Sequence, residues 1–144
     1  MKKRHGQFAQ GLALFNDGKF FEAHEAWEEI WLAESEPEKT FLQGLIQVAA
    51  AFHHAQRGNA PGMTSLLKAG LEKLSRFAVD HRGIAVRKLC EDSRRCAELV
   101  VSDKDIGAKQ FPQIGYEVKD FETNSSAVAK RNRAPRSTSR PRAR

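Results

Sequence analysis

Cysteine, tyrosine and proline are scarce in this chain of 144 residues, and no long hydrophobic run is present. The two cysteines, Cys90 and Cys96, are six positions apart, so on one helix they point in different directions and cannot form a disulfide with each other. Free thiols are typical of a reducing compartment, and we therefore expect a cytoplasmic protein. No apolar stretch approaches the roughly 20 residues that cross a bilayer, and the basic N-terminus lacks the apolar segment of a secretory signal. We expect no membrane association.

Acidic residues are missing from the end of the chain. Residues 130–144 carry seven lysines and arginines and no aspartate or glutamate, whereas the other 129 residues carry 17 basic and 18 acidic side chains. From residue 123 onward almost no large apolar side chain is present, so burial cannot offset the entropy of ordering. The sequence therefore predicts one domain over 1–122 and a disordered basic tail over 123–144. The tail is either a solubilising extension or a weak, salt-dependent contact with nucleic acid.

The spacing of apolar residues predicts an all-α fold. Turn signals such as NDGK and RGNAPG separate the apolar segments, with Gly18 and Gly58 suited to left-handed helix caps and Pro61 to a first turn. The pattern predicts a compact bundle of about five helices built from helical hairpins, over residues 7–15, 20–34, 38–57, 61–79 and 84–101. The hairpins resemble tetratricopeptide repeats, but their spacing of 40 residues and the lack of a third copy favour a bundle. The stretch FPQIGYEVKDF is expected to form an irregular strap over this bundle.

The segment FFEAHEAWEEIW, residues 20–31, combines aromatic residues with one histidine and four glutamates. At 100° per residue, His24 and Glu28 fall inside an aromatic stripe that we expect to enter the core, and the other three glutamates form a solvated face. The segment is not an H-E-x-x-H zinc-protease motif, because Glu28 replaces the second histidine. A histidine–glutamate pair in such a stripe is either a buried structural pair or part of a functional site. The stripe consists of Phe20, Phe21, Trp27 and Trp31.

The next predicted helix has no charged side chain from residue 41 to residue 56. Gln43, Gln47 and His54 line up on one face of this helix, small alanines lie between them, and Gly44 permits close approach of a neighbour. One interpretation is a polar stripe that faces water. The other is a pocket between the two helices, which would contain His24, Glu28, Gln43, Gln47 and His54.

The sequence leaves three functions open, and it does not decide whether the chain is an enzyme. The first is a domain that binds a small ligand or a protein partner through the polar pocket. The second is a metal-dependent, hydrolase-like enzyme with His24, Glu28 and His54 as ligands of a divalent metal that activates water. Glutamine is a poor transition-metal ligand and no E-x-x-H pair is present, which disfavours this alternative. The third is a structural network that fixes helix register in a homo-oligomer or a docking protein.

Three stretches together, FNDGKFFEAHEAWEEIW, LQGLIQVAAAFHHAQRGN and LLKAGLEKL, resemble domain-of-unknown-function family 309. The resemblance covers residues 15–74 and leaves out the basic tail. It implies a small all-α protein of a mostly bacterial and archaeal family, and no established reaction. Trp27 stands where many relatives have leucine. The family pattern falls on Phe15, Gly18, Glu22, His24, Glu28, Trp31, Gln43, Gly44, Gln47, His54, Gly58 and Asn59.

Overall fold

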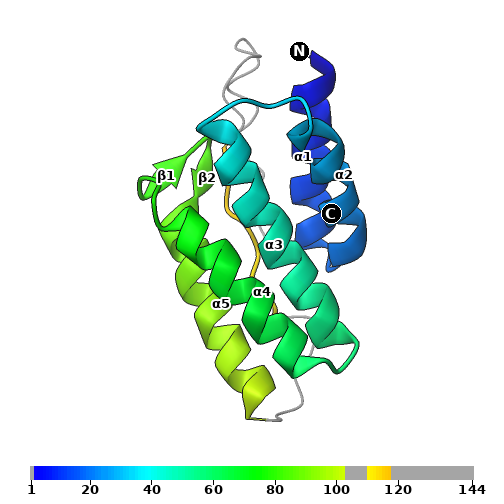
Figure 1. Ribbon diagram of the computed structural model, residues 1–144, viewed down its shortest axis with the longest axis vertical. Helices are drawn as coiled ribbons and strands as arrows, with labels where there is room; N and C mark the ends of the chain where they lie inside the picture. The colour runs from blue at the N-terminus through cyan, green and yellow to red at the C-terminus, as the bar shows by residue number, and fades with distance from the viewer. Residues whose placement is uncertain (1, 103–109, 118–144) are drawn as a thin grey trace.

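The computed structural model describes residues 2–102 and 110–117, with side chains from His5 onward. Within these residues five helices and one short β-hairpin follow one another, which confirms the all-α class (Figure 1). Residues 103–109 and 118–144, including the basic tail expected over 123–144, lie outside the described residues, so the domain boundary at residue 122 stays a prediction. The elements are α1 (Lys2–Asn16), α2 (Phe20–Trp31), α3 (Glu38–Gln56), α4 (Ala60–Leu74), β1 (Asp80–His81), β2 (Ile84–Ala85) and α5 (Val86–Val101).

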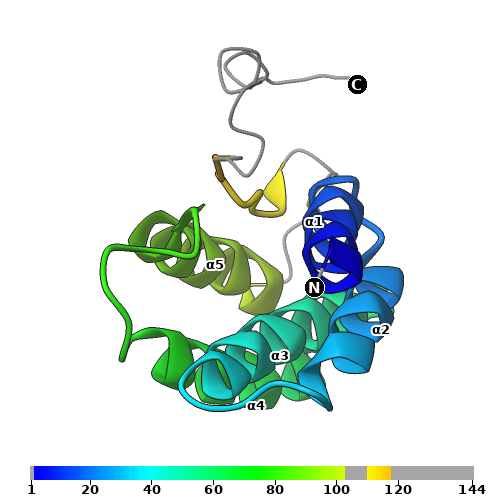
Figure 2. The same cartoon turned by 90° about the horizontal axis from the view of Figure 1, so that it is seen from above.

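Each helix packs against the next one along the chain, as expected for helical hairpins. Seen from above, the helices curve around the segment 110–117, which lies between α1 and α5 (Figure 2). None of the described helices is both long enough and apolar enough to cross a membrane. Helices α3 and α4 pack closely, because a Cβ atom at Gly44 would lie 2.9 Å from the Leu74 side chain and one at Gly70 would lie 2.9 Å from the Gly44 carbonyl oxygen. The expectation that Gly44 admits a neighbouring helix is confirmed.

Aromatic rings fill the space where α1, α2 and α3 meet. Trp27 is completely buried, its ring centroid lies 6.1 Å from that of Phe15, and its indole nitrogen donates a hydrogen bond to the Phe8 carbonyl oxygen at 3.1 Å. Phe20 makes an edge-to-face contact with Phe15 at 4.9 Å and a tilted contact with Phe52 at 5.6 Å. Such pairs favour one relative position of the helices, which fixes the start of α2 beside the end of α3.

Two glycines end helices as the sequence predicts. Gly18 and Gly58 have φ angles of 79° and 76°, a left-handed conformation that only glycine adopts without strain. After Gly58, the Asn59 side chain caps α4 by accepting a hydrogen bond from the Gly62 N–H at 3.0 Å. The helix limits differ from the predicted ones mainly at two places. Helix α1 begins at Lys2 and not near residue 7, and α4 stops at Leu74 and not near residue 79, because the chain turns there into a β-hairpin that the sequence pattern did not predict.

The β1–β2 hairpin closes one end of the molecule (Figure 1). Arg82 and Gly83 form its turn with φ angles of 54° and 77°, the handedness that two-residue hairpin loops require. Sequence patterns do not signal this turn, because arginine is uncommon in this conformation. The Arg82 guanidinium lies 4.1 Å from the centroid of the Phe8 ring and 3.5 Å from a Glu38 oxygen, which ties the hairpin to α1 and α3.

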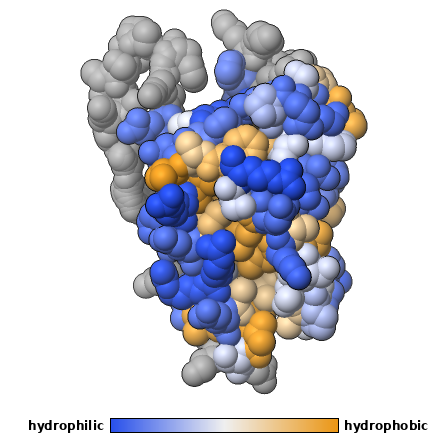
Figure 3. All heavy atoms as spheres, turned by 60° about the vertical axis from the view of Figure 1, so that its left-hand side comes forward, coloured by the Kyte–Doolittle hydropathy of each residue, from blue (hydrophilic) through white to orange (hydrophobic). Residues whose placement is uncertain are grey.

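Helix α5 has one apolar and one charged face. Its inner side contributes Leu89, Cys90 and Cys96 to the core, whereas charged residues such as Arg94 and Arg95 are exposed. On the side of the molecule where the hairpin and α5 come forward, hydrophilic side chains surround a smaller apolar area (Figure 3). Both thiols are free and buried, and burial raises the pKa of Cys96 to about 11. The prediction that the two cysteines are unpaired is confirmed, and a raised pKa makes them poor nucleophiles.

Candidate functional site

The aromatic stripe of α2 only partly enters the core. Phe20 and Trp27 are buried, but Phe21 is 46% exposed and Trp31 is half-buried. The buried face is completed by Ala23, Ala26 and Ile30 and is centred about a quarter turn from His24. The expectation that all four aromatics lie in the core was wrong, because the small alanines face the neighbouring helices while two large rings cover the edges.

His24 and Glu28 therefore lie at the edge of the core and not inside it. Their side chains are 23% and 53% exposed, and Nε2 of His24 is 3.5 Å from a Glu28 carboxylate oxygen. The His24 ring stacks on Phe21 with centroids 5.8 Å apart and planes inclined by 20°. Its Nδ1 atom is buried and has no hydrogen-bond partner among the described residues. The remaining glutamates of α2, Glu22, Glu25 and Glu29, are exposed as expected.

The polar residues of α3 turn toward α4 more than toward α2. Gln43, Gln47 and His54 are all half-buried on one face, as the helical wheel predicts. Gln47 accepts a hydrogen bond from the Lys73 ammonium group of α4 at 3.0 Å. Nδ1 of His54 lies 2.9 Å from the side-chain nitrogen of Asn59, the N-cap residue of α4.

The structure thus divides four of the five candidate residues, all except Gln43, into two groups. His24 and Glu28 pair with each other on α2, whereas Gln47 and His54 bond to residues at α4. Within residues 2–102 and 110–117, no group of three or more His, Cys, Asp or Glu side chains is arranged to hold a metal ion. The metal alternative with His24, Glu28 and His54 remains a prediction. Elemental analysis of untagged protein tests it, since stoichiometric zinc, manganese or iron is required.

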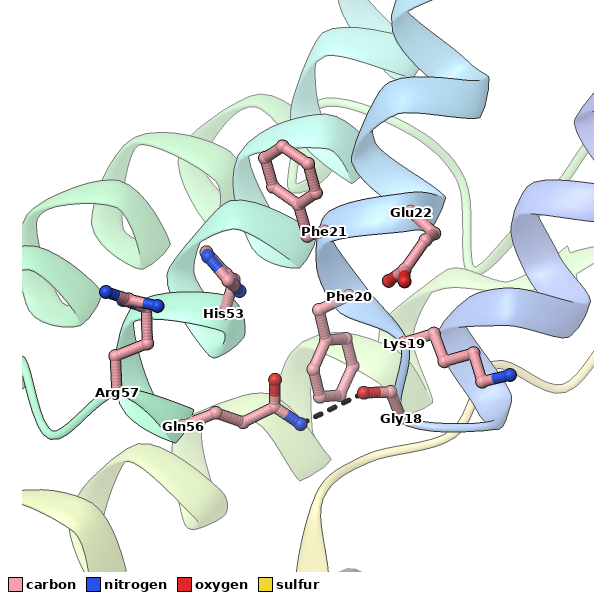
Figure 4. A pocket seen from close by; sticks show the side chains of 8 residues that line it. All are labelled: Gly18, Lys19, Phe20, Phe21, Glu22, His53, Gln56 and Arg57. Carbon is pink, nitrogen blue, oxygen red and sulfur yellow. Dashed lines mark hydrogen bonds between the residues drawn. The ribbon is translucent and has the colours of Figure 1, made fainter.

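An open pocket of about 510 Å³ lies where the start of α2 meets the end of α3 (Figure 4). The Gln56 side chain donates a hydrogen bond to the Gly18 carbonyl oxygen at 2.9 Å and joins the two helix ends. None of the five candidate residues lines this pocket. Two short stretches 30 or more positions apart build it, and helical periodicity cannot reveal such a meeting. The lining consists of Gly18, Lys19, Phe20, Phe21, Glu22, His53, Gln56 and Arg57.

Phe21 links this pocket to the His24–Glu28 pair. Its ring stacks on His24 and also packs against His53, with centroids 5.2 Å apart. Figure 4 shows His53 and Arg57 together on the α3 side of the pocket, and Lys19 and Glu22 on the opposite side of the α2 ribbon. Helix α2 begins without a side-chain cap. The N-cap residue is Lys19, and its side chain accepts no hydrogen bond from the N–H groups of the first turn. The result is an exposed aromatic ring between two imidazole groups, with the Arg57 guanidinium on the same side of the pocket as His53.

Comparison with known proteins agrees with the resemblance seen in the motifs. Residues 8–66 match the family model described as a domain of unknown function, DUF309. An uncharacterised protein of Aquifex aeolicus (strain VF5) is 32% identical over 109 residues, which cover 75% of this chain and 31% of that relative. The chain therefore spans about a third of the length of this relative. The match of residues 8–66 to the DUF309 model confirms the family resemblance that the sequence motifs indicate.

Proposed function

We propose that this chain is a binding domain for a small aromatic anion, held in the pocket between the start of α2 and the end of α3. The observation that carries the proposal is the position of Phe21. This large ring is 46% exposed, lines the pocket, and lies between the imidazole rings of His24 and His53. In the free protein the exposed part of this apolar ring is in contact with water, which is unfavourable. A planar ligand that stacks on the ring would remove that surface from water.

The charged side chains of the pocket indicate what else the ligand carries. Arg57 is exposed at the end of α3, and its planar guanidinium group suits a carboxylate or a phosphate. The uncapped N–H groups at the start of α2 add a favourable potential for an anion. Lys19 contributes less, because its ammonium group lies 3.6 Å from an Asp17 carboxylate oxygen. Glu22, in the first turn of α2, suits a hydroxyl or amino group of the ligand.

The size of the pocket fits this class of ligand. A volume of about 510 Å³ lies within the range of roughly 300–1,000 Å³ in which small-molecule sites usually fall. In this proposal His24 and Glu28 act as positioning residues and not as direct ligand contacts. Glu28 holds the imidazole ring of His24, and that ring sets the angle of Phe21 through stacking.

Thermal denaturation in the presence of aromatic carboxylates and nucleoside monophosphates tests the proposal. A ligand present at ten times its dissociation constant stabilises the folded state by about 1.4 kcal/mol, which shifts the midpoint measurably. We expect Arg57→Ala and Phe21→Ala each to remove the shift. Arg76→Ala is the matched control, because Arg76 is also an exposed arginine, lies just after α4 outside the pocket, and pairs with Glu72 at 2.8 Å. The proposal fails if no compound of the panel stabilises the wild-type chain, or if the Arg57→Ala and Arg76→Ala variants respond alike.

A further inference from the structure

Residues 110–117, called the strap below, lie across the helices like a bound peptide. Most of the strap follows an extended course, with only single backbone hydrogen bonds to the rest of the chain. In Figure 2 it lies between α1 and α5, on the side around which the helices curve. This arrangement confirms the irregular strap predicted from the sequence, for the part that the structure describes.

The side chain of Asn16 forms two hydrogen bonds with the main chain of the strap. Its Nδ2 atom donates to the Ile114 carbonyl oxygen at 3.0 Å, and its Oδ1 atom accepts from the Ile114 N–H at 2.6 Å. The Gln113 side chain donates to the carbonyl oxygen of Asn16 itself at 2.9 Å. A carboxamide that satisfies both polar groups of one residue recognises an extended backbone irrespective of its side chain.

The β-hairpin supplies a second set of main-chain bonds. The Ala85 N–H donates to the Gly115 carbonyl oxygen, and the Glu117 N–H donates to the Gly83 carbonyl oxygen, both at 2.9 Å. Tyr116 forms an antiparallel bridge with Ile84. The strap thereby adds to the edge of the hairpin, which is how β-augmentation domains bind extended peptides.

Two side chains of the strap fill apolar space. The Phe111 ring lies 5.3 Å from the Phe20 ring and 5.8 Å from the Phe52 ring. Ile114 is 2% exposed. Pro112, buried between them, has no N–H group that would need a partner. Main-chain bonds together with two side-chain positions three residues apart are the elements of a selective peptide site.

We propose that this surface, the strap groove, is a peptide-binding site that the chain occupies with its own residues 110–117. The groove is formed by Asn16, Phe20, Phe52 and the hairpin. Its partner is an extended segment of another protein that matches the Phe-Pro-x-Ile-Gly pattern of the strap. This segment carries an aromatic residue, a proline directly after it, and an aliphatic residue two positions after the proline. The strap competes with this partner from within the same chain, so the apparent affinity is set by the fraction of molecules in which the strap has left the groove.

The test measures binding of a fluorescein-labelled peptide of residues 109–118 to the full-length chain by fluorescence anisotropy. In the double variant Phe111→Ala and Ile114→Ala, the chain's own strap is weakened and the groove is intact. We expect this variant to bind the peptide at least about tenfold more tightly than the wild type, a change equivalent to one lost contact of moderate strength. Adding Asn16→Ala to the variant should reverse the gain, and a peptide with alanine at the Phe and Ile positions should not bind.

Equal affinity of the wild-type chain and a folded strap variant for the peptide would overturn the proposal. If the strap variant does not fold, hydrogen exchange of the wild-type chain decides. We expect the amides of Ile114 and Glu117 to exchange through a local opening that leaves the amides of α3 protected. If all these amides exchange in one global step, the strap leaves the groove only when the whole protein unfolds. That result would also overturn the proposal.

Discussion

Replacing Gly11 by alanine is expected to destabilise the protein, although alanine favours helix formation. Gly11 lies in α1 directly against the Trp27 indole, and an added Cβ atom would lie 2.5 Å from its Cε2 atom and 2.6 Å from its Cδ1 atom. Trp27 cannot easily retreat, because it is completely buried between the Phe8 and Phe15 rings, with centroids 6.4 and 6.1 Å away. Its hydrogen bond to the Phe8 carbonyl oxygen would also be displaced.

Three contributions set the size of the effect. Overpacking of a core typically costs about 1–3 kcal/mol. Loss of the indole hydrogen bond adds about 1 kcal/mol, whereas alanine in place of glycine inside a helix returns about 1 kcal/mol. We therefore expect the free energy of unfolding to fall by about 1–3 kcal/mol in Gly11→Ala, measured by urea denaturation followed by far-ultraviolet circular dichroism.

Two variants isolate the collision as the cause. Gly6 lies in the same helix with nothing within 4 Å of its added Cβ atom, so Gly6→Ala should stabilise the protein by about 0.5–1 kcal/mol. In a Trp27→Leu background the indole is absent, and Gly11→Ala should lose most of its penalty. Unchanged or increased stability of the single Gly11→Ala variant, or an equal penalty in both backgrounds, would refute the packing described for α1 and α2.

Three further predictions concern the polar pair, a thiol and the tail. Because Glu28 is half-exposed, Glu28→Gln and His24→Ala should each lower the free energy of unfolding by less than about 1 kcal/mol, and a loss of several kcal/mol would make the pair structural. The pKa of Cys96 rises from 9.0 to about 11 on folding, so the unfolded thiol ionises first and stability falls between these pH values, by at most about 1.4 kcal/mol per pH unit. Urea unfolding of Cys96→Ala across the same pH range should lack this contribution; an identical pH slope would contradict the assignment. Removal of residues 123–144 should abolish any salt-sensitive binding to DNA or RNA, and binding that survives would place the interaction in the helical part.

The sequence predicts the fold where local chemistry decides it. Gly18 and Gly58 end helices through their positive φ angles, and Asn59 and Pro61 begin α4, so these boundaries follow from neighbouring residues. The hairpin turn at Arg82 does not follow, because its conformation depends on contacts with α1 and α3 that only the folded chain provides.

The candidate site is less predictable, because it depends on how helices pack. The helical wheel places His24 and Glu28 beside aromatic residues correctly, but it cannot show that Ala23 and Ala26 face the core while Phe21 remains exposed. The pocket joins residues 18–22 to residues 53–57 through a bond between Gln56 and Gly18. No repeating pattern within either stretch signals the other.

The strap follows the elements of its groove in the sequence. During synthesis the groove is therefore made first and is unoccupied until the strap has been made. The elements around the groove end with α5 at Val101, whereas its own occupant ends at Glu117. Translation adds roughly 5–20 residues per second, so about 1–3 seconds separate the two events. A matching segment of another protein near the ribosome meets no internal competitor during that interval, and the first complex of each molecule is then decided by timing as well as by affinity.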